Sequence, residues 1–180
     1  MYLALGSVIE KVYGNNISSP TDEIPLHHLL TRVLEVEQDL STWTQGLPRG
    51  LFPVTASDLD RLGVDDSDAH RFRIILTLRF LNVRMLLHRS VLSRLLEERS
   101  HDCNAVYRDF MLMMSAGSLG MCVDAAVETI AIISRTTQRQ HVLPIWWYSI
   151  YFGKLDRMIK MQLSATKRLT YVSLQLSVLR

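Results

Sequence analysis

The chain has 180 residues and a hydrophobic content of 48%, which suits one domain with a buried core and excludes a disordered chain. Its net charge of +2 hides an asymmetry, because residues 1–70 hold 11 acidic and 4 basic side chains, whereas residues 71–180 hold 7 and 16. We expect the two parts to dock through complementary charge; the alternative, a basic surface for nucleic acid, is disfavoured because most of these arginines stand in apolar helical segments.

Nearly all predicted elements of the first third are helical. Residues 1–13 read as a short apolar helix that Gly14 ends, and Pro25 begins a second helix with Thr21 or Asp22 as its cap. Apolar residues recur at helical spacing from there to Trp43, and residues 46–53 break the helix. Residues 55–68 are predicted to form an acidic loop with one helical turn at 57–62.

A long helix is predicted from Ala69 to about Leu96, followed by a loop over residues 98–104. The helix is apolar around most of its circumference, which is typical of a central helix, and its polar stripe consists of Arg73, Thr77, Arg84 and His88. The next helix is predicted from about Gly117 to Arg135, with these inward positions: Leu119, Val123, Ala126, Ile130 and Ile133. No heptad repeat persists long enough to predict a coiled coil.

The last predicted helix runs from about Pro144 to Arg168, and the residues after it follow a different pattern. Val172, Leu174, Leu176 and Val178 alternate with polar residues, as in a strand, although a helical protein offers no sheet for that strand to join. The sequence therefore predicts an all-α fold, an irregular helical bundle around the long central helix. We interpret the chain as a truncated domain that ends before residues 169–180.

Sequence motifs for metals and phosphates are weak. Residues 65–68 read Asp-Asp-Ser-Asp, which we interpret as an acidic cap for the long helix. His27 and His28 are adjacent and point about 100° apart on a helix, so we expect one in the core and one on the surface. Cys103 and Cys122 form no Cys-x-x-Cys pair and are too few for a disulfide scaffold, so we expect no zinc and a buried Cys122. We read Gly117 to Gly120 as a helix start.

The sequence shows no signal peptide, because residues 1–13 lack a basic start and a small-residue cleavage site. The nearly uncharged stretch over residues 110–123 is too short to span a bilayer. The prediction is an intracellular soluble protein with no membrane partner.

Three blocks on successive predicted helices carry a family resemblance. They are Leu86-Leu87-His88-Arg89, Cys122 followed by Ala125-Ala126, and Ile145-Trp146-Trp147 after Pro144; Trp43 with Leu47-Pro48 lies upstream. Their order resembles the middle homology region of fungal transcription factors, the regulatory domain of zinc-cluster regulators, from about Leu29 to Met161. Ser90 stands where that family prefers proline.

The resemblance implies a partial regulatory domain over residues 1–168, with an acidic part at 1–68 and a helical core at 69–168. It implies a non-catalytic nuclear protein that controls transcription through its own factor's other segments, a homodimer or the transcription machinery, with a small effector as a further ligand. It implies no cofactor in this chain, because the family's zinc belongs to an N-terminal cluster that is absent here. This chain alone should therefore read no DNA sequence.

Two candidate sites follow from the sequence. An effector is predicted to bind in a seam between two helices, where small residues meet aromatic ones: Cys122, Ala126, Trp147, Tyr148 and Tyr151. Arg89 is predicted to form a structural pair with Asp124 or Glu128, because a nearly buried arginine needs a carboxylate. The alternative function is a small all-helical enzyme or a lipid-binding protein with an internal apolar pocket.

Overall fold

A computed structural model of the chain describes residues 2–14, 24–62, 67–98 and 105–137, and all regular structure in these ranges is helical. The helices are α1 (Tyr2–Val8), the π-helix η1 (Ile9–Tyr13), α3 (Leu26–Gln45), the 3-10 turn η2 (Arg49–Leu51), α4 (Ala56–Leu62), α5 (Asp68–Glu98) and α6 (Ala105–Thr137). They lie within one compact unit, residues 1–139. The predicted all-α fold is confirmed.

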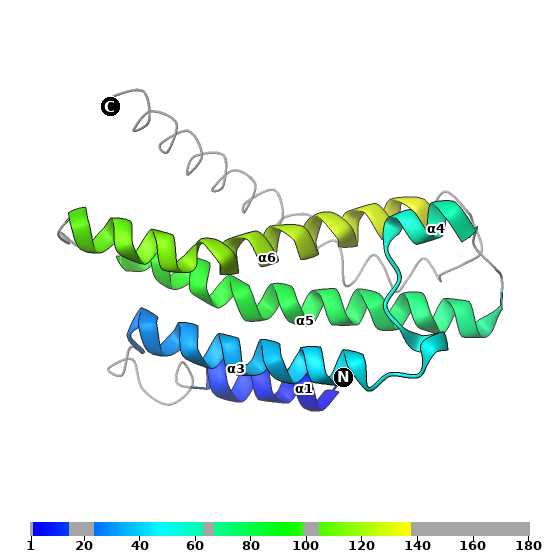
Figure 1. The fold of residues 1–180 in the computed structure, drawn as a ribbon, viewed down its shortest axis with the longest axis horizontal. Coiled ribbons are helices and arrows are strands. Elements are labelled where there is room, and N and C mark those ends of the chain that lie inside the picture. Colours follow the sequence, from blue (N-terminus) through cyan, green and yellow to red (C-terminus); the bar gives the residue numbers. More distant parts are fainter. Residues whose placement is uncertain (1, 15–23, 63–66, 99–104, 138–180) are drawn as a thin grey trace, which may run out of the picture. The chain divides into compact units, whose positions relative to one another are not determined.

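Helix α5 lies in the middle of this unit, as its nearly all-round apolar sequence predicted. Figure 1 shows α6 along one side of α5 and α3 with α1 along the other, and each long helix runs antiparallel to the one before it. Six residues separate α5 from α6, and a connection of this length favours antiparallel neighbours. Of the helix pairs described, α5 and α6 share the most extensive contact.

The core between α5 and the N-terminal helices is aliphatic. Buried residues of α3 recur at alternating steps of three and four: Leu26, Leu29, Val33, Val36 and Leu40. They pack with Val83, Leu87 and Val91 of α5 and with Val8 and Val12 of the first helical segment. Each fully buried side chain of this size stabilises the fold by about 1.5–3 kcal/mol, so this cluster fixes α1 and α3 on α5.

The opposite side of α5 meets α6 in a seam with heptad spacing. The buried residues of α5 on this side are Ile74, Leu78, Leu81, Met85, His88, Leu92 and Leu95, and those of α6 are Met111, Ser115, Cys122, Ala125, Thr129, Ile132 and Thr136. Steps of three and four along both helices are those of knobs-into-holes packing. Five of these seven α6 positions are Ser, Thr, Cys or Ala rather than large apolar residues, which explains why the sequence shows no apolar heptad repeat there.

Helix α6 begins at Ala105, twelve residues before its predicted start. Gly117 and Gly120 lie inside the helix, where a Cβ atom at either position would meet no other atom within 4 Å. Glycine in a helix interior costs about 1 kcal/mol relative to alanine. The predicted inward face was also rotated, since Ile130 is exposed and Cys122, Thr129 and Ile132 are buried.

Several helix ends match their predicted signals. Gly14 follows η1, and a Cβ atom there would overlap the carbonyl oxygen of Glu10. Helix α3 ends at Gly46 as expected. Ser67 caps α5 by accepting a hydrogen bond from the amide of His70 at 3.4 Å. Helix α5 does not break after Arg89, because Ser90 continues it and donates its hydroxyl to the carbonyl of Leu87.

Several sequence predictions fall outside the described residues. They are the helix over 144–168, the strand-like stretch over 172–178, the caps Thr21 and Asp22, and Cys103.

Candidate functional site

The polar stripe of α5 divides into two groups of tertiary hydrogen bonds. At the N-terminal end of the helix, Arg73 Nε donates to the carbonyl of Phe52 at 2.6 Å, and buried Thr77 accepts from the amide of Val54 at 3.1 Å. These bonds hold the segment between η2 and α4 against α5. A buried backbone group left without such a partner costs about 1–3 kcal/mol.

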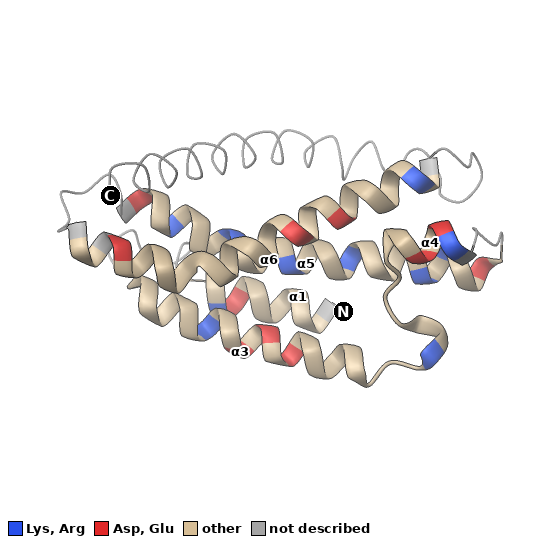
Figure 2. Cartoon of the chain, turned by 45° about the horizontal axis from the view of Figure 1, so that its top comes forward, with Lys and Arg blue, Asp and Glu red and all other residues tan. Residues whose placement is uncertain are grey.

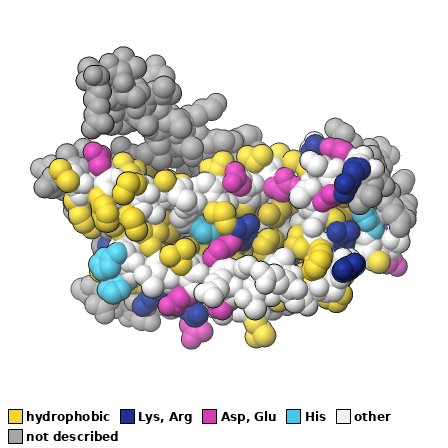
Figure 3. Space-filling model, viewed as in Figure 1, with side chains coloured by type: hydrophobic (Ala, Val, Ile, Leu, Met, Phe, Trp, Pro, Cys, Tyr) yellow, Lys and Arg dark blue, Asp and Glu magenta, His cyan; other side chains and the backbone are white. Residues whose placement is uncertain are grey.

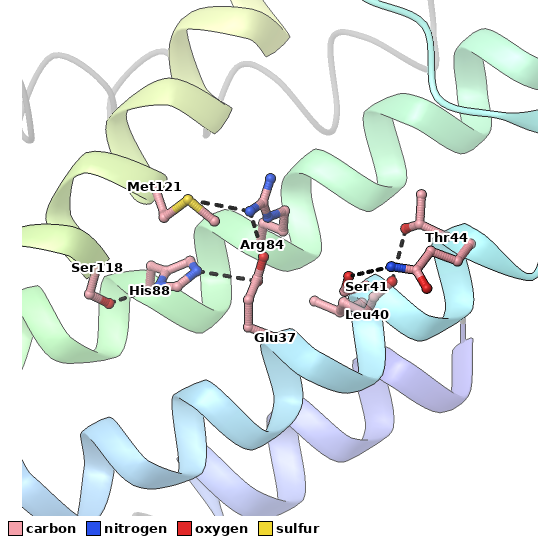
Figure 4. A network of polar contacts seen from close by, with 9 residues as sticks. Glu37, Leu40, Ser41, Thr44, Arg84, His88, Ser118 and Met121 are labelled. Atoms are coloured by element: carbon pink, nitrogen blue, oxygen red, sulfur yellow. Dashed lines mark hydrogen bonds and ion pairs between the residues drawn. The ribbon is translucent and has the colours of Figure 1, made fainter.

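Further along α5, a polar network connects three helices. Arg84 donates to Glu37 of α3 at 2.5 Å, and His88 Nε2 lies 3.3 Å from the other carboxylate oxygen of Glu37. His88 Nδ1 lies 2.7 Å from the hydroxyl of Ser118 on α6. Figure 4 shows these side chains converging between α3, α5 and α6. The network therefore fixes the register of α3 and α6 on the central helix.

The network is mostly withdrawn from water. The side chains of Arg84 and Glu37 are 23% and 21% exposed, and that of His88 is 4% exposed. A carboxylate only accepts hydrogen bonds, so His88 Nε2 carries a proton; the hydroxyl of Ser118 can donate to or accept from Nδ1. Both ring nitrogens of His88 are thus engaged.

Aromatic and sulfur groups surround the Arg84 guanidinium. Its central carbon lies 5.5 Å from the centre of the Phe80 ring, and Nη2 lies 3.3 Å from the sulfur of Met121. The Phe80 ring stacks on Trp43, with 6.0 Å between ring centres. Cation–π contact of this kind is worth about 0.5–2 kcal/mol. This surround holds the arginine in place.

A second contact ties the first helical segment to α5. The hydroxyl of Tyr13 donates to the carbonyl of Leu86 at 2.7 Å. Burial raises the pKa of Tyr13, and the positive charge of Arg89 opposes that rise.

The predicted partners of Arg89 lie on α6, where Glu128 bonds to α4. The carboxylate of Glu128 accepts a hydrogen bond from the amide of Ala56 at the start of α4, at 2.5 Å, where negative charge meets the positive end of the helix dipole. Asp124 is exposed. Two turns beyond Glu128, Arg135 Nε lies 2.7 Å from Asp60 of α4. Glu128 and Arg135 therefore clamp α4 onto α6, and the pairing of Arg89 with Asp124 or Glu128 stays a prediction.

Of the predicted effector seam, the structure places two residues. Cys122 and Ala126 are both buried, and the Cys122 thiol points to the carbonyl of Met85 on α5, 3.8 Å away. The buried state predicted for Cys122 is confirmed. Trp147, Tyr148 and Tyr151 lie outside the described residues, so the seam also stays a prediction.

Metal-binding chemistry finds little support in the described ranges. Within them, no three His, Cys, Asp or Glu side chains are grouped so as to hold a metal ion. His27 and His28 are both exposed, with ring centres 4.3 Å apart, so the expectation of one buried histidine was wrong. Leu26 and Leu29 beside them take the core positions of α3.

Helix α6 is unusually apolar. Its segment Asp109–Thr136 is long and apolar enough to cross a membrane by length and composition alone. Figure 2 shows few charged residues along this helix. Core helices of soluble proteins meet the same criterion, and α6 packs here against α5 and α4.

Sequence reasoning missed Glu37 and Ser118 as members of the polar network. Glu37 follows the core residue Val36, and Ser118 lies between the buried positions Ser115 and Cys122. The sequence signal that could have identified them is a polar residue next to the buried apolar positions of α3 and of α6. In the structure these residues face the polar stripe of α5. That signal identifies a partner only when the register between helices is known.

Comparison with known proteins gives a distant relationship. The chain is 23% identical over 158 residues to "Transcription factor FBD3" of Gibberella moniliformis (strain M3125 / FGSC 7600) and 24% identical over 162 residues to "Transcription factor FBD3" of Fusarium pseudograminearum (strain CS3096). Each similarity covers 84% of this chain but only 21% of the relative. No model of a known protein family matches the chain, and no solved structure does.

Proposed function

We propose that the chain is a helical regulatory domain of a fungal transcription factor, which acts in the nucleus by protein contacts and without catalysis. The observation that carries this proposal is its similarity, over 84% of its length, to two fungal proteins named as transcription factors. The chain spans about a fifth of those relatives' length, so their activity as whole proteins comes to this chain only as part of the proposal.

The character of the polar network supports a structural rather than a chemical role. Its charged groups pair with one another and with a histidine and a serine, across three helices. A buried network of this kind sets which helix faces meet, because a shifted register would leave its charges unpaired. A domain that works through contacts with other proteins needs such a defined helical scaffold. A small effector remains part of the proposal as a possible ligand of the seam at Cys122 and Trp147.

The test is to tether the chain to a promoter. Fused to a heterologous DNA-binding domain in a fungal host, the full chain should raise or lower a reporter gene at least several-fold relative to the DNA-binding domain alone. A Leu87→Asp variant serves as the control, because a charge at this fully buried position should unfold the bundle and abolish the effect. An unchanged reporter with a well-expressed nuclear fusion would contradict the proposal, as would turnover of a substrate by the purified chain.

A further inference from the structure

Helix α6 carries a second seam on the side that faces away from α5. Its positions recur at steps of three and four, and its apolar and glycine members are Val106, Phe110, Met113, Gly117, Gly120 and Val127, with Asp124 at the position between Gly120 and Val127. We call this set the outer face of α6. Val106 is 75% exposed and Met113 is 68% exposed, and the other large members are about half exposed. Figure 3 shows hydrophobic side chains gathered over the N-terminal half of this helix.

The extent of this surface sets it apart from scattered apolar residues. Four large side chains on the outer face are exposed, and Tyr107, Met114 and Ile130 extend the exposed apolar surface along its flanks. The largest apolar patch on a typical monomer is about 300–600 Å², and a stable interface takes roughly 800 Å² from each partner. Seven large apolar residues on one helix, each 43–75% exposed, make a surface whose area is on the order of these values.

The two glycines point to a helix as the occupant. Both are exposed in the middle of α6, and a Cβ atom at either would meet no other atom of the described chain within 4 Å. The two glycines therefore lower the stability of α6, and no close contact inside the bundle requires them. Small residues at the middle of a helix face let a second helix backbone approach closely, which is the benefit that can offset that cost.

The order of side chains along the outer face is self-complementary about the midpoint between Gly117 and Gly120. If two copies of α6 cross antiparallel at this midpoint, Gly117 of one lies opposite Gly120 of the other. Phe110 then lies opposite Val127 and Met113 opposite Asp124, so each bulky N-terminal half covers the smaller C-terminal half of the partner, with one carboxylate beside each Met113. Such an arrangement is a closed twofold contact.

Charge favours the antiparallel direction. Asp124 is the charged residue on the line of the outer face, and it is exposed. In a parallel pair the two Asp124 carboxylates would lie opposite each other, whereas in the antiparallel pair they stand about eleven helical positions apart, on the order of 16 Å. Antiparallel pairing also opposes the two helix dipoles.

We propose that the outer face of α6 is a self-association surface, through which a second copy of this chain packs antiparallel across Gly117 and Gly120. The inference stands on the surface of α6 alone and does not depend on the proposed function. Sedimentation equilibrium of the full chain should show a dimer that dissociates on dilution. Because each new charge would be buried twice in a twofold contact, Met113→Glu with Val127→Glu should raise the dissociation constant by at least ~100-fold.

Two variants separate this result from misfolding. Leu34→Glu is the matched control, because Leu34 is 68% exposed on α3; it should leave the dimer unchanged. Gly120→Leu should raise the melting temperature of the monomer through better helix propensity and weaken the dimer by preventing close approach. Circular dichroism checks that each variant folds, and if the double variant does not, Met113→Gln with Val127→Thr replaces it.

A chain that remains monomeric over a 100-fold range of protein concentration in the sedimentation experiment would overturn the proposal. Residues 138–180 or another protein would then cover this face. A dimer that tolerates both the charge substitutions and Gly120→Leu would overturn it equally, because association would then use another surface.

Discussion

At the scale of single residues, the fold depends on polar groups that find partners on other helices. Glu37 is the centre of this arrangement, since its two oxygens engage Arg84 and His88 separately. Removing one member of a buried charged pair leaves the other without compensation, and this loss exceeds the net value of the pair. The side chains here are about a fifth exposed, so water screens part of the loss.

Replacement of Glu37 should therefore destabilise the bundle. We expect Glu37→Ala to lower the free energy of unfolding by about 2 kcal/mol, as measured by urea denaturation, because Arg84 and His88 lose their acceptor. Glu35→Ala is the control, since Glu35 is exposed on the same helix; it should change stability by less than about 0.5 kcal/mol. Equal effects from both substitutions would show that the network adds nothing beyond helix propensity.

A second residue-scale feature is the cap of α4. Asp58 accepts hydrogen bonds from the amide of Thr55 at 3.0 Å and from its hydroxyl at 2.8 Å, and the Thr55 hydroxyl accepts from the amide of Asp58. This reciprocal pair is a capping box. The bonds to Thr55 backbone and side chain lower the pKa of Asp58 below its ordinary value of 3.8.

The lowered pKa predicts how acid affects α4. The folded state holds the Asp58 proton less tightly than the unfolded state, so this contribution to stability is complete above pH 3.8 and is lost as pH falls through the lower folded pKa. We expect Asp58→Asn to be less stable than the original chain at neutral pH, with a gap that closes towards pH 2. Thermal melts of both proteins from pH 2 to pH 6 measure this gap. A gap that stays constant down to pH 2 would contradict the prediction.

At the scale of helices, α6 shows how small and polar residues make a buried seam. Ser118 bonds to His88, whereas the hydroxyl of Ser115, fully buried one turn earlier, finds no hydrogen-bond partner in the described chain. A buried hydroxyl without a partner costs about 1–3 kcal/mol. Serine therefore stabilises the fold at position 118 and destabilises it at position 115 of the same seam.

These two serines give a matched pair of substitutions. We expect Ser115→Ala to stabilise the protein by about 1 kcal/mol, because it removes an unsatisfied group and improves helix propensity. Ser118→Ala gains the same propensity but loses the bond to His88, so it should destabilise by about 1 kcal/mol. Chemical denaturation of both variants gives the difference directly. If Ser115→Ala is the less stable of the two, the hydroxyl of Ser115 has a partner such as a buried water.

At the scale of the whole molecule, two ion pairs join the acidic and basic parts of the sequence: Arg84 with Glu37 and Arg135 with Asp60. In α5, Arg73 bonds to a loop carbonyl, Arg84 to Glu37 and Arg94 to Glu97. Arg135 of α6 pairs with Asp60 in the acidic part of the sequence. These contacts favour the expectation that the acidic and basic parts dock on each other rather than form a nucleic-acid surface.

DNA binding should accordingly be weak and non-specific. We expect the full chain to bind a 20-base-pair duplex without sequence preference, and its affinity should fall steeply between 50 and 200 mM salt because phosphate contacts release counterions. Fluorescence anisotropy with two unrelated duplexes at both salt concentrations measures this. Tight binding to one duplex at 200 mM salt would contradict the expectation that this chain alone reads no DNA sequence.

Sequence alone was sufficient for the all-α fold, the central position of α5, the helix ends at Gly14 and Gly46, and the burial of Cys122. Each follows from periodicity or backbone chemistry that acts within a few residues. The tertiary structure decided the extent of α6, whose interior glycines resembled a helix start, and the heptad seam that Ser, Thr, Cys and Ala had concealed. It also decided that Glu37 and Ser118 meet His88. Those choices depend on which faces of distant segments pack together, and no local pattern contains the register between two helices.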